Sequence, residues 1–313
     1  MLTILLPALI RLRGGLAAAP QLARWLGCAD ALAPGKPGRD EQLLRHFDVR
    51  PRTLPDAPIS RELDVGDGGY GAWLRCDPTY VRADLTTVRM LAYGDGLELT
   101  PDEAQALIAP LKPLFGDAGM PISAPLAQRW YLMLPADARL PVFSRPDEVL
   151  GDDLGAHLPE GPEGRRWRHL LNEAQVLLHQ HPHNAERVAA GKAAVNSLWF
   201  FGGGRLPTQV KTGAARVASG DLLIQGLCRL AGVECIAPAG LQQALADCEL
   251  IDLRRARDIA ELEGELLPAL LQCLARRERT AVRLDFADGH GFELRREQRW
   301  RWLRRPLRDW SAA

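Results

Sequence analysis

Short apolar runs alternate with amphipathic stretches along most of the chain. The apolar runs Thr3–Leu6 and Val195–Phe201 predict buried strands, and Gly202–Gly204 is expected to end the second one. Partial alternation of apolar and polar residues predicts two more strands, Ala72–Val81 and Val88–Tyr93. Strands that alternate with helices predict an α/β protein with a mostly parallel, helix-covered sheet.

Several helix ends are marked by their capping residues. Thr100-Pro-Asp-Glu103 has the pattern of a capping box, in which Thr caps the helix and Glu reaches back. Asp221 is expected to open a helix that Gly232 ends. Arg165–His181 predicts an amphipathic helix with its apolar residues on one face. By contrast, the Pro-containing segment Leu54–Pro58 predicts a loop.

The C-terminal region predicts a hairpin and a tail rich in Arg and Trp. Ala281–Phe286 and Phe292–Arg296 flank Asp288-Gly289, a pair typical of tight hairpin turns. Trp300 and Trp302 alternate with arginines, which favours a half-buried strand with the tryptophans on the core. Arg and Trp together can also bind single-stranded nucleic acid, and this reading is less favoured.

Composition narrows the class of protein. The 313 residues carry 39 basic and 39 acidic side chains, so no net charge attracts nucleic acid or an anionic membrane. Six cysteines without a C-x-x-C pair indicate reduced thiols rather than a disulfide framework. The apolar start, Met1–Leu9, is too short to span a bilayer and its charges follow it. A cytoplasmic protein is expected.

Six blocks, in the correct order, resemble the archaeal-type cofactor-independent phosphoglycerate mutases of the alkaline-phosphatase superfamily. The blocks are Ala19–Leu26 (APQLARWL), Ala72–Asp77 (AWLRCD), Leu97–Leu107 with its T-x-x-E-A step, His181–Arg187 (HPHNAER), Asn196–Pro207 (NSLWFFGGGRLP) and Asp221–Gly232 (DLLIQGLCRLAG). The fourth and fifth blocks are most similar to a bacterial set of Rpf-type (RpfE-like) regulatory proteins.

The resemblance implies a discontinuous architecture. Residues 1–58 and 196–313 would form the alkaline-phosphatase-like core, and residues 59–195 an inserted, substrate-like α+β domain.

The chain departs from the mutase pattern where the chemistry should be. The reaction of the mutase family requires two metal ions and a Ser or Thr nucleophile, and the metal ions hold the attacking and leaving oxygens. Leu6-Pro7-Ala8 stands where the first metal-binding Asp is expected, and Ala19 stands where a hydroxyl is expected. Glu249–Leu267 contains no histidine. We therefore expect no catalytic residue, no metal site and no cofactor.

Two other groups of residues could be mistaken for metal ligands. Asp285, Asp288 and His290 could be a remnant of a D-H step, but a D-G hairpin turn explains them without metal. His179, His181 and His183 lie across a helix end at Pro182, where helix termination is the simpler interpretation.

The polar residues of the matching blocks are the candidate ligand site. An arginine can bind phosphate or carboxylate with two parallel hydrogen bonds, and a glycine loop lets backbone N–H groups approach a phosphate. Structural roles in salt bridges, caps and tight packing are the alternative for each residue. The candidates are Arg75, Asp77, Asn184, Arg187, Asn196, Gly203, Gly204 and Arg205.

The leading hypothesis is a non-catalytic or diverged mutase-like protein that is regulatory or binds a small phosphorylated or carboxylated metabolite. The alternative is a metal-dependent mutase or phosphohydrolase with an unrecognised metal set. A third hypothesis is a protein–protein adaptor, which a large exposed apolar patch would favour.

Overall fold

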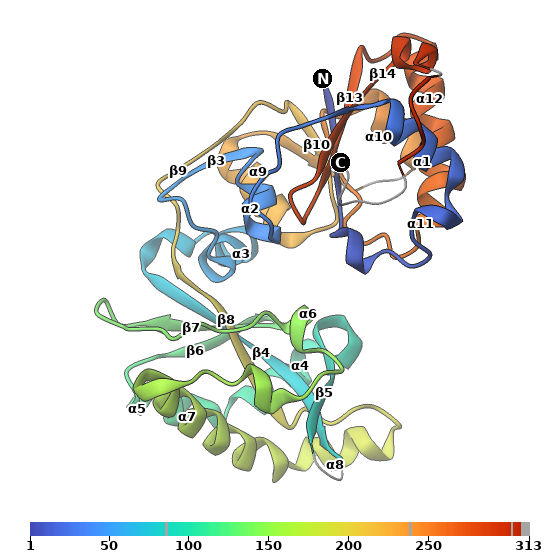
Figure 1. The fold of residues 1–313 in the computed structure, drawn as a ribbon. Coiled ribbons are helices and arrows are strands. Elements are labelled where there is room, and N and C mark those ends of the chain that lie inside the picture. Colours follow the sequence, from blue (N-terminus) through green and yellow to red (C-terminus); the bar gives the residue numbers. More distant parts are fainter. Residues whose placement is uncertain (85–86, 238–239, 302, 308–313) are drawn as a thin grey trace. The chain divides into compact units, whose positions relative to one another are not determined.

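The computed structural model describes residues 1–84, 87–237, 240–301 and 303–307 (Figure 1). Its contacts divide the chain into two compact units. Unit 1 comprises Met1–Thr53 and Pro207–Ala313, and unit 2 comprises Leu54–Leu206.

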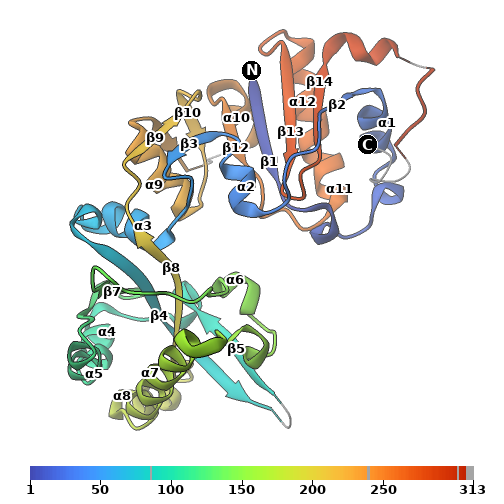
Figure 2. The same ribbon diagram turned by 60° about the vertical axis from the view of Figure 1, so that its left-hand side comes forward.

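Unit 1 is built on a mixed, mostly parallel sheet with β1 (Leu2–Leu6) in its interior. Its parallel strands are β10 (Arg216–Ala218), β11 (Glu234–Ile236), β12 (Leu250–Asp252) and β13 (Ala281–Phe286). The strands β14 (Gly291–Arg295) and β2 (Asp30–Ala31) extend the sheet in antiparallel order. The strand order is β11-β10-β12-β1-β13-β14-β2, which confirms the predicted α/β class (Figure 2).

Helices cover the sheet of unit 1 because its inner strands are apolar on both faces. All five residues of β1 are buried, and burying one such side chain stabilises the fold by about 1.5–3 kcal/mol. α1 (Pro20–Cys28), α10 (Leu241–Asp247) and α12 (Leu267–Ala275) share one apolar core with β1 and β13. α9 (Leu222–Ala231) packs against β11 and against β9 (Gln209–Thr212), which pairs with β3 (Phe47–Arg50).

Unit 2 contains a five-stranded antiparallel sheet. β4 (Ala72–Ala83) pairs with β5 (Val88–Tyr93), β7 (Arg129–Leu134) and β8 (Ser197–Arg205), and β7 pairs with β6 (Ile122–Leu126). Side chains of a strand point alternately to the two faces. Leu74 and Cys76 accordingly join the core with α4 (Pro101–Ile108), α5 (Leu111–Asp117) and α7 (Gly161–His179). Trp73 and Arg75 contact side chains of α3 (Asp56–Asp64) on the other face.

Two predictions about unit 2 are wrong in their limits. The segment Leu54–Pro58 is not all loop, because α3 begins at Asp56. Proline is compatible with a helix's first turn, where its missing N–H has no intrahelical partner. β8 does not end before the glycines but continues through them to Arg205, paired with Ala72 and Trp73 of β4.

The pairing of β8 with β4 also fixes where the chain leaves unit 2. The contacts place the second boundary after Leu206, whereas the sequence suggested a boundary at residue 195. The identity of the two units as a superfamily core and a substrate-like insertion stays a prediction.

The tail does not form the predicted strand. Arg296–Trp300 is a 3₁₀ helix, and the side chain of Trp300 is 69% exposed rather than packed on the core. Trp302 lies outside the described residues. Gln298, in contrast, is buried and donates hydrogen bonds to Asp30 and to the backbone of Glu293, which fix the turn. Local hydrogen bonding therefore overrides the two-residue alternation here.

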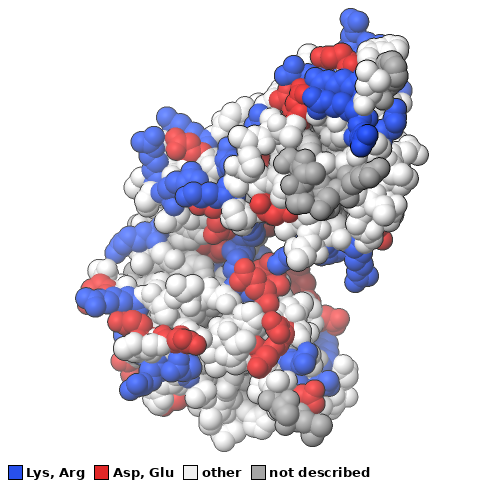
Figure 3. Space-filling model, in the orientation of Figure 1, with Lys and Arg blue, Asp and Glu red and all other residues white. Residues whose placement is uncertain are grey.

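Charges of both signs are interspersed on the visible face of the molecule, as expected for a chain without net charge (Figure 3). Among the described residues, no helix has the length and apolar character needed to cross a membrane.

Candidate functional site

The carboxyl ends of the parallel strands in unit 1 bring several acidic side chains to one edge of the sheet. Ser219 and Asp221 follow β10, Asp252 ends β12, and Asp285 lies near the end of β13. Neighbouring strands β10, β12, β1 and β13 lie side by side in the sheet. In open α/β sheets, ligands bind at the carboxyl ends of the strands, so this edge is the first place to look for a site.

Two arginines neutralise two of these carboxylates. Arg254 donates to Asp252 through Nε (2.7 Å) and Nη2 (3.1 Å), and its Nη2 lies 3.3 Å from Oδ2 of Asp221. Arg39 donates from Nη2 to both carboxylate oxygens of Asp221, at 3.3 and 3.0 Å. Ser219 completes the set by donating to Asp252 at 2.9 Å. We call Arg39, Asp221, Arg254, Asp252 and Ser219 the edge network.

Asp221 also performs a structural task in the edge network. Its Oδ1 accepts hydrogen bonds from the N–H groups of Leu223 (3.0 Å) and Ile224 (3.2 Å), so Asp221 is the N-cap of α9. Burial works against the charged form, but Arg39 and Arg254 outweigh it and hold the pKa of Asp221 at about 2. The carboxylate is therefore committed to internal partners on both oxygens.

Asp285 is occupied in the same way. It accepts hydrogen bonds from Arg45 Nε (3.0 Å), and His46 Nε2 lies 2.6 Å from its Oδ2. Despite burial, these two partners lower the pKa of Asp285. Gln42 links β1 and β13 at this edge by donating to the carbonyl oxygens of Leu6 (3.0 Å) and Asp285 (2.6 Å).

The start of α1 has no hydroxyl and no open anion site. Ala19, at the N-cap position, is fully buried and makes no side-chain hydrogen bond. Glu263 lies at this helix end and accepts a hydrogen bond from the N–H of Leu22 at 2.9 Å. A helix N-terminus favours negative charge, and a carboxylate of the chain itself fills that place here.

These residues do not fit a two-metal centre. Metal ligands need oxygen or imidazole lone pairs that are not already committed, whereas Asp221, Asp252 and Asp285 each accept hydrogen bonds from an arginine. Asp288 accepts from the N–H of Leu9 at 2.8 Å and lies 3.1 Å from His290 Nδ1. No group of three or more His, Cys, Asp or Glu residues in the described part of the chain could hold a metal ion.

The predicted ligand residues Arg75 and Asp77 lie in unit 2 and bind each other. Both are almost completely buried on β4, and Arg75 donates to Asp77 from Nε at 2.8 Å and also from Nη2. Arg75 further donates to Ser60 of α3 at 3.1 Å, and Asp77 accepts the N–H of Trp130 at 3.1 Å. Burial disfavours the charge, but Asp77 outweighs it and raises the pKa of Arg75.

The predicted residues around α8 (Pro182–Ala189) tie backbone segments together. Asn184 donates to the carbonyls of Leu178 (2.7 Å) and Val195 (2.8 Å). Arg187, 2% exposed, donates to Ala193 O (2.9 Å) and to Glu103 (2.8 Å).

Asn196 and the glycines lie elsewhere in unit 2. Asn196 exchanges two hydrogen bonds with the backbone of Val81, at 2.9 and 2.8 Å. Gly203 faces Leu140 and Leu74 so closely that a β-carbon would lie 2.4 Å from Leu140. Gly204 packs on Pro55, and Arg205 is exposed. Of the predicted residues, the structure therefore brings Arg75 and Asp77 into direct contact, and Asn184 and Arg187 lie on the same helix but bind different internal partners.

The histidines at the end of α7 divide between two helices. α7 ends at His179, and His181 is the N-cap of α8, accepting the N–H of His183 at 3.3 Å. The rings of His181 and His183 stack with centroids 5.5 Å apart, and His183 lies 2.6 Å from Glu186. Burial and the neighbouring His183 lower the pKa of His181. This arrangement agrees with helix termination, the simpler interpretation of the sequence.

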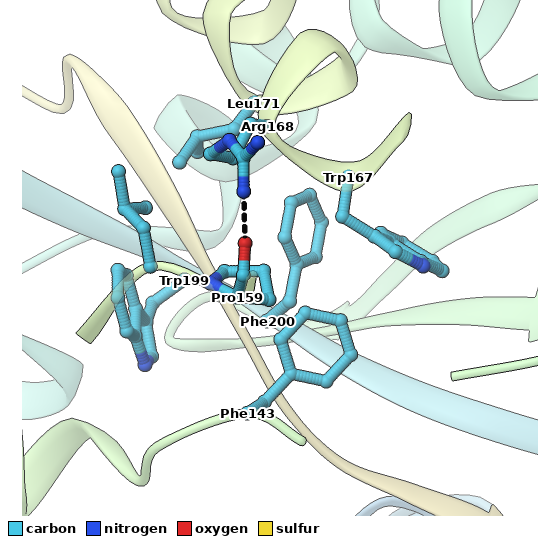
Figure 4. A pocket seen from close by; sticks show the side chains of 8 residues that line it. Phe143, Pro159, Trp167, Arg168, Leu171, Trp199 and Phe200 are labelled. Atoms are coloured by element: carbon cyan, nitrogen blue, oxygen red, sulfur yellow. Dashed lines mark hydrogen bonds between the residues drawn. The ribbon is translucent and has the colours of Figure 1, made fainter. Parts of the chain in front are cut away.

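Unit 2 has an aromatic cavity that is nearly filled by its own walls. Phe143, Trp167, Trp199 and Phe200 surround it, and Arg168 donates to the carbonyl of Pro159 at its rim (Figure 4). Its volume of about 10 Å³ has room for about one water molecule. A metabolite does not fit there.

A second, polar cavity of about 220 Å³ is large enough for a small metabolite. Its charged lining residues are Asp137, Arg139, Glu163 and Arg166, and Met120 and Trp167 supply apolar walls. Sequence reasoning missed this group because Asp137 and Arg139 lie in an irregular segment, while Arg166 lies on α7. No residue spacing links the two segments.

No family model matches the chain. It is 28% identical to the 2,3-bisphosphoglycerate-independent phosphoglycerate mutase of Methanosarcina barkeri, over 54% of this chain and 45% of that protein. It is 32% identical to a probable enzyme of the same name from Geobacter sulfurreducens, over 30% of this chain and 25% of that protein. The matched segments therefore span less than half of these curated relatives.

Among solved structures, the cofactor-independent phosphoglycerate mutase from Thermoplasma acidophilum is similar over 93% of this chain and 88% of that one. Its sequence identity is 16% and its TM-score 0.43. The sequence matches to the curated phosphoglycerate mutases agree with the coarse part of the resemblance drawn from the motifs.

Proposed function

We propose that this chain is a non-catalytic, phosphoglycerate-mutase-like protein with a regulatory or ligand-binding role. The observation that carries the proposal is the edge network. Arg39 and Arg254 supply the positive charge that two acidic side chains at the strand ends need, so these acids are neutralised inside the fold. A guanidinium group only donates hydrogen bonds: it cannot coordinate an oxygen ligand or activate a bound water molecule as a nucleophile. An arginine therefore does not replace a metal ion in phosphoryl transfer.

A second observation supports the same proposal independently. A covalent phosphoryl intermediate needs a nucleophilic oxygen, and the start of α1 offers the buried methyl group of Ala19. The carboxylate of Glu263 lies where a helix N-terminus would otherwise attract an anion. Like charges repel, so this carboxylate disfavours a phosphoryl group at that position.

The ligand that we propose is a small phosphorylated or carboxylated metabolite. The polar cavity of unit 2 suits it best, because Arg139 and Arg166 can form paired hydrogen bonds with such an anion. Asp137 and Glu163 in the same lining favour a ligand that also carries hydroxyl groups as donors. The resemblance of two blocks to Rpf-type regulatory proteins supports a regulatory use of such binding.

The catalytic part of the proposal is tested by metal content and turnover. The purified protein is analysed for bound metals and assayed with 3-phosphoglycerate in the presence of Mn²⁺. We expect less than one bound metal per chain and no conversion to 2-phosphoglycerate. Two tightly bound metals with measurable turnover would restore the enzyme hypothesis and refute this one.

The ligand part is tested by calorimetric titration with 3-phosphoglycerate. We expect Arg139→Ala and Arg166→Ala each to weaken binding about tenfold, by analogy with the loss of one charged hydrogen bond. Arg165→Ala is the matched control, because Arg165 is also exposed on α7 but does not line the cavity. Equal binding by all four proteins would show that the cavity is not the site. Absence of binding by the unaltered protein would exclude this metabolite as the ligand.

A further inference from the structure

The C-terminal segment of unit 1 concentrates positive charge in a chain that has no net charge overall. Residues 295–305 contain six arginines and one glutamate, a net charge of +5. A local excess of charge attracts a polyanion at short range even where the charges of the whole protein cancel. The arrangement of this segment in the fold decides what kind of polyanion suits it.

The segment packs on α1 and is not a loose tail. Arg301 donates from Nη1 to the carbonyl oxygen of Cys28 at 3.0 Å. Gly27 of the same helix lies so close to the segment that a β-carbon there would be 2.2 Å from the carbonyl oxygen of Arg305. The backbone that carries the arginines is therefore already in place, and a ligand does not have to order it.

Trp300 is the feature of this segment that solvated arginines alone do not explain. Its side chain is 69% exposed at the end of the 3₁₀ helix Arg296–Trp300, and that of Leu303 is 79% exposed. A tryptophan ring has a large apolar area that a ligand can cover. The other tryptophans whose side chains the structure describes are buried or half-buried: Trp25, Trp73, Trp130, Trp167 and Trp199.

The arginines of the segment divide into two groups. Arg295 and Arg301 form ion pairs with acidic side chains of unit 1. Arg296, Arg304 and Arg305 form no ion pair with an acidic residue in the described part of the chain, and the last two are exposed. Arg304 donates one hydrogen bond to a backbone carbonyl at 3.3 Å, which leaves its other N–H groups for a ligand.

The second group lies near Trp300 along the fold. Arg296 begins the short helix that Trp300 ends. The N–H of Arg304 donates to the carbonyl oxygen of Arg301 at 3.0 Å, and this turn keeps Arg304 and Arg305 close to the residue that follows Trp300. We call Arg296, Trp300, Arg304 and Arg305 the tail patch.

We propose that the tail patch binds single-stranded nucleic acid, DNA or RNA, without sequence specificity. A base stacks on the indole of Trp300, and the three arginines bind the neighbouring phosphates. Stacking on a side chain is sequence-tolerant because every base has a π-face. The sequence had made this function less favoured because the tryptophans were expected on the core, and the exposure of Trp300 removes that reason. The proposal does not rest on the metabolite site of unit 2.

Two other partners fit the tail patch less well. The major groove of a DNA duplex accommodates an α-helix or a two-stranded ribbon, whereas the tail patch consists of a five-residue 3₁₀ helix and the turn after it. A helix that anchors to an anionic membrane presents a long apolar face. Here the exposed apolar side chains are those of Trp300 and Leu303, and arginines flank them.

The test is titration of the whole protein into fluorescein-labelled oligothymidylate and oligouridylate of about 12 nucleotides, followed by fluorescence anisotropy. We expect a Kd between about 1 and 100 μM at about 50 mM salt for at least one of them. Binding of only one identifies DNA or RNA as the ligand. Because three arginines bind phosphates in this proposal, the affinity should fall about 15-fold between about 50 and 200 mM salt.

Substitutions separate stacking from charge. Trp300→Ala should weaken binding about tenfold without changing the salt dependence, and Trp300→Phe, which keeps a ring, should restore most of the affinity. Arg305→Ala should reduce the slope of log K against log salt concentration by about 0.7. Glu297→Gln should tighten binding, because it removes an exposed acidic charge beside the tail patch. Arg11→Ala is the control, because Arg11 is an exposed arginine of unit 1 outside the tail patch.

Three results would overturn the proposal. The first is no binding of either oligonucleotide at about 50 mM salt. The second is equal affinity of Trp300→Ala and the unaltered protein, which would show attraction by charge alone. The third is binding to vesicles that contain phosphatidylserine without binding to oligonucleotides, which would assign the tail patch to a membrane surface.

Discussion

Arg254 binds Asp252 through two parallel hydrogen bonds, Nε to Oδ1 at 2.7 Å and Nη2 to Oδ2 at 3.1 Å. Both side chains are about one-tenth exposed. At this depth the pair is stable only because each charge neutralises the other. The arrangement matters for function because Asp252 ends a parallel strand, at the edge of the sheet where α/β proteins bind ligands.

Removal of Arg254 should therefore destabilise unit 1. Arg254→Ala leaves the Asp252 carboxylate buried without its cation, and we expect a loss of about 3 kcal/mol in the free energy of unfolding. Urea unfolding followed by circular dichroism measures the change. Arg255→Ala is the control, because Arg255 is exposed and its loss should cost less than about 0.5 kcal/mol. Equal losses in the two variants would contradict the assigned role of the pair.

Asp221 should make the stability of the protein depend on pH in the acid range. Its folded pKa of about 2 lies below the ordinary value of 3.8, so the folded state binds the proton less readily than the unfolded state. The stabilisation is complete above about pH 4 and is lost as the pH falls through 2. It amounts to about 2 kcal/mol.

Asp221→Asn tests this dependence, because the amide oxygen can still cap α9. We expect the variant to be less stable than the unaltered protein at pH 6 and the difference in unfolding free energy to shrink between pH 4 and 2. A difference that stays constant over this range would show that the charge of Asp221 contributes nothing.

Glu263 should stabilise α1 through the hydrogen bond to Leu22 and the charge at the helix N-terminus. Glu263→Ala removes both, with an expected loss of about 1 kcal/mol, while Glu263→Gln keeps the acceptor and should lose about half as much. Thermal unfolding of both variants measures this, with Glu265→Ala at an exposed neighbouring position as the control. If Glu263→Ala melted at the same temperature as that control, α1 would be stabilised by other contacts.

Features that depend on neighbouring residues could be predicted from the sequence. The capping box of Thr100 and Glu103 and the Asp221 and Gly232 ends of α9 are confirmed, because their signals lie within one helix. The mostly parallel sheet followed from the alternation of strands and helices. The roles of the polar residues in the motifs were harder to predict. Arg, Asn and Asp side chains can bind a ligand or can form hydrogen bonds inside the fold, and the sequence does not distinguish the two roles.

The edge network could not be predicted, because its members come from distant parts of the chain. Arg39 and Asp221 are separated by 182 positions, and only the folded sheet brings them together. The sequence showed that Leu6-Pro7-Ala8 and Ala19 stand where ligands were expected. The sequence did not show that arginines neutralise Asp221 and Asp252 at the strand ends. It also did not show that Glu263 lies at the start of α1.

Arg187 separates the ligand-binding interpretation of the matching blocks from a structural one. Its guanidinium binds Glu103 and two backbone carbonyls, of Ala193 and Leu97, so its loss removes the donor from three acceptors that are partly or fully buried. Arg187→Met, which keeps most of the side-chain volume, should lower the unfolding free energy by about 3 kcal/mol.

The same variant should still bind 3-phosphoglycerate with unchanged affinity at a temperature well below its melting point, because the guanidinium faces internal partners. Its partner variant Glu103→Gln should be affected less, since the amide oxygen can still accept from Arg187. A normal melting temperature combined with a tenfold or greater loss of affinity would assign Arg187 to the ligand site. The contacts of Arg187 would then have to rearrange when the metabolite binds.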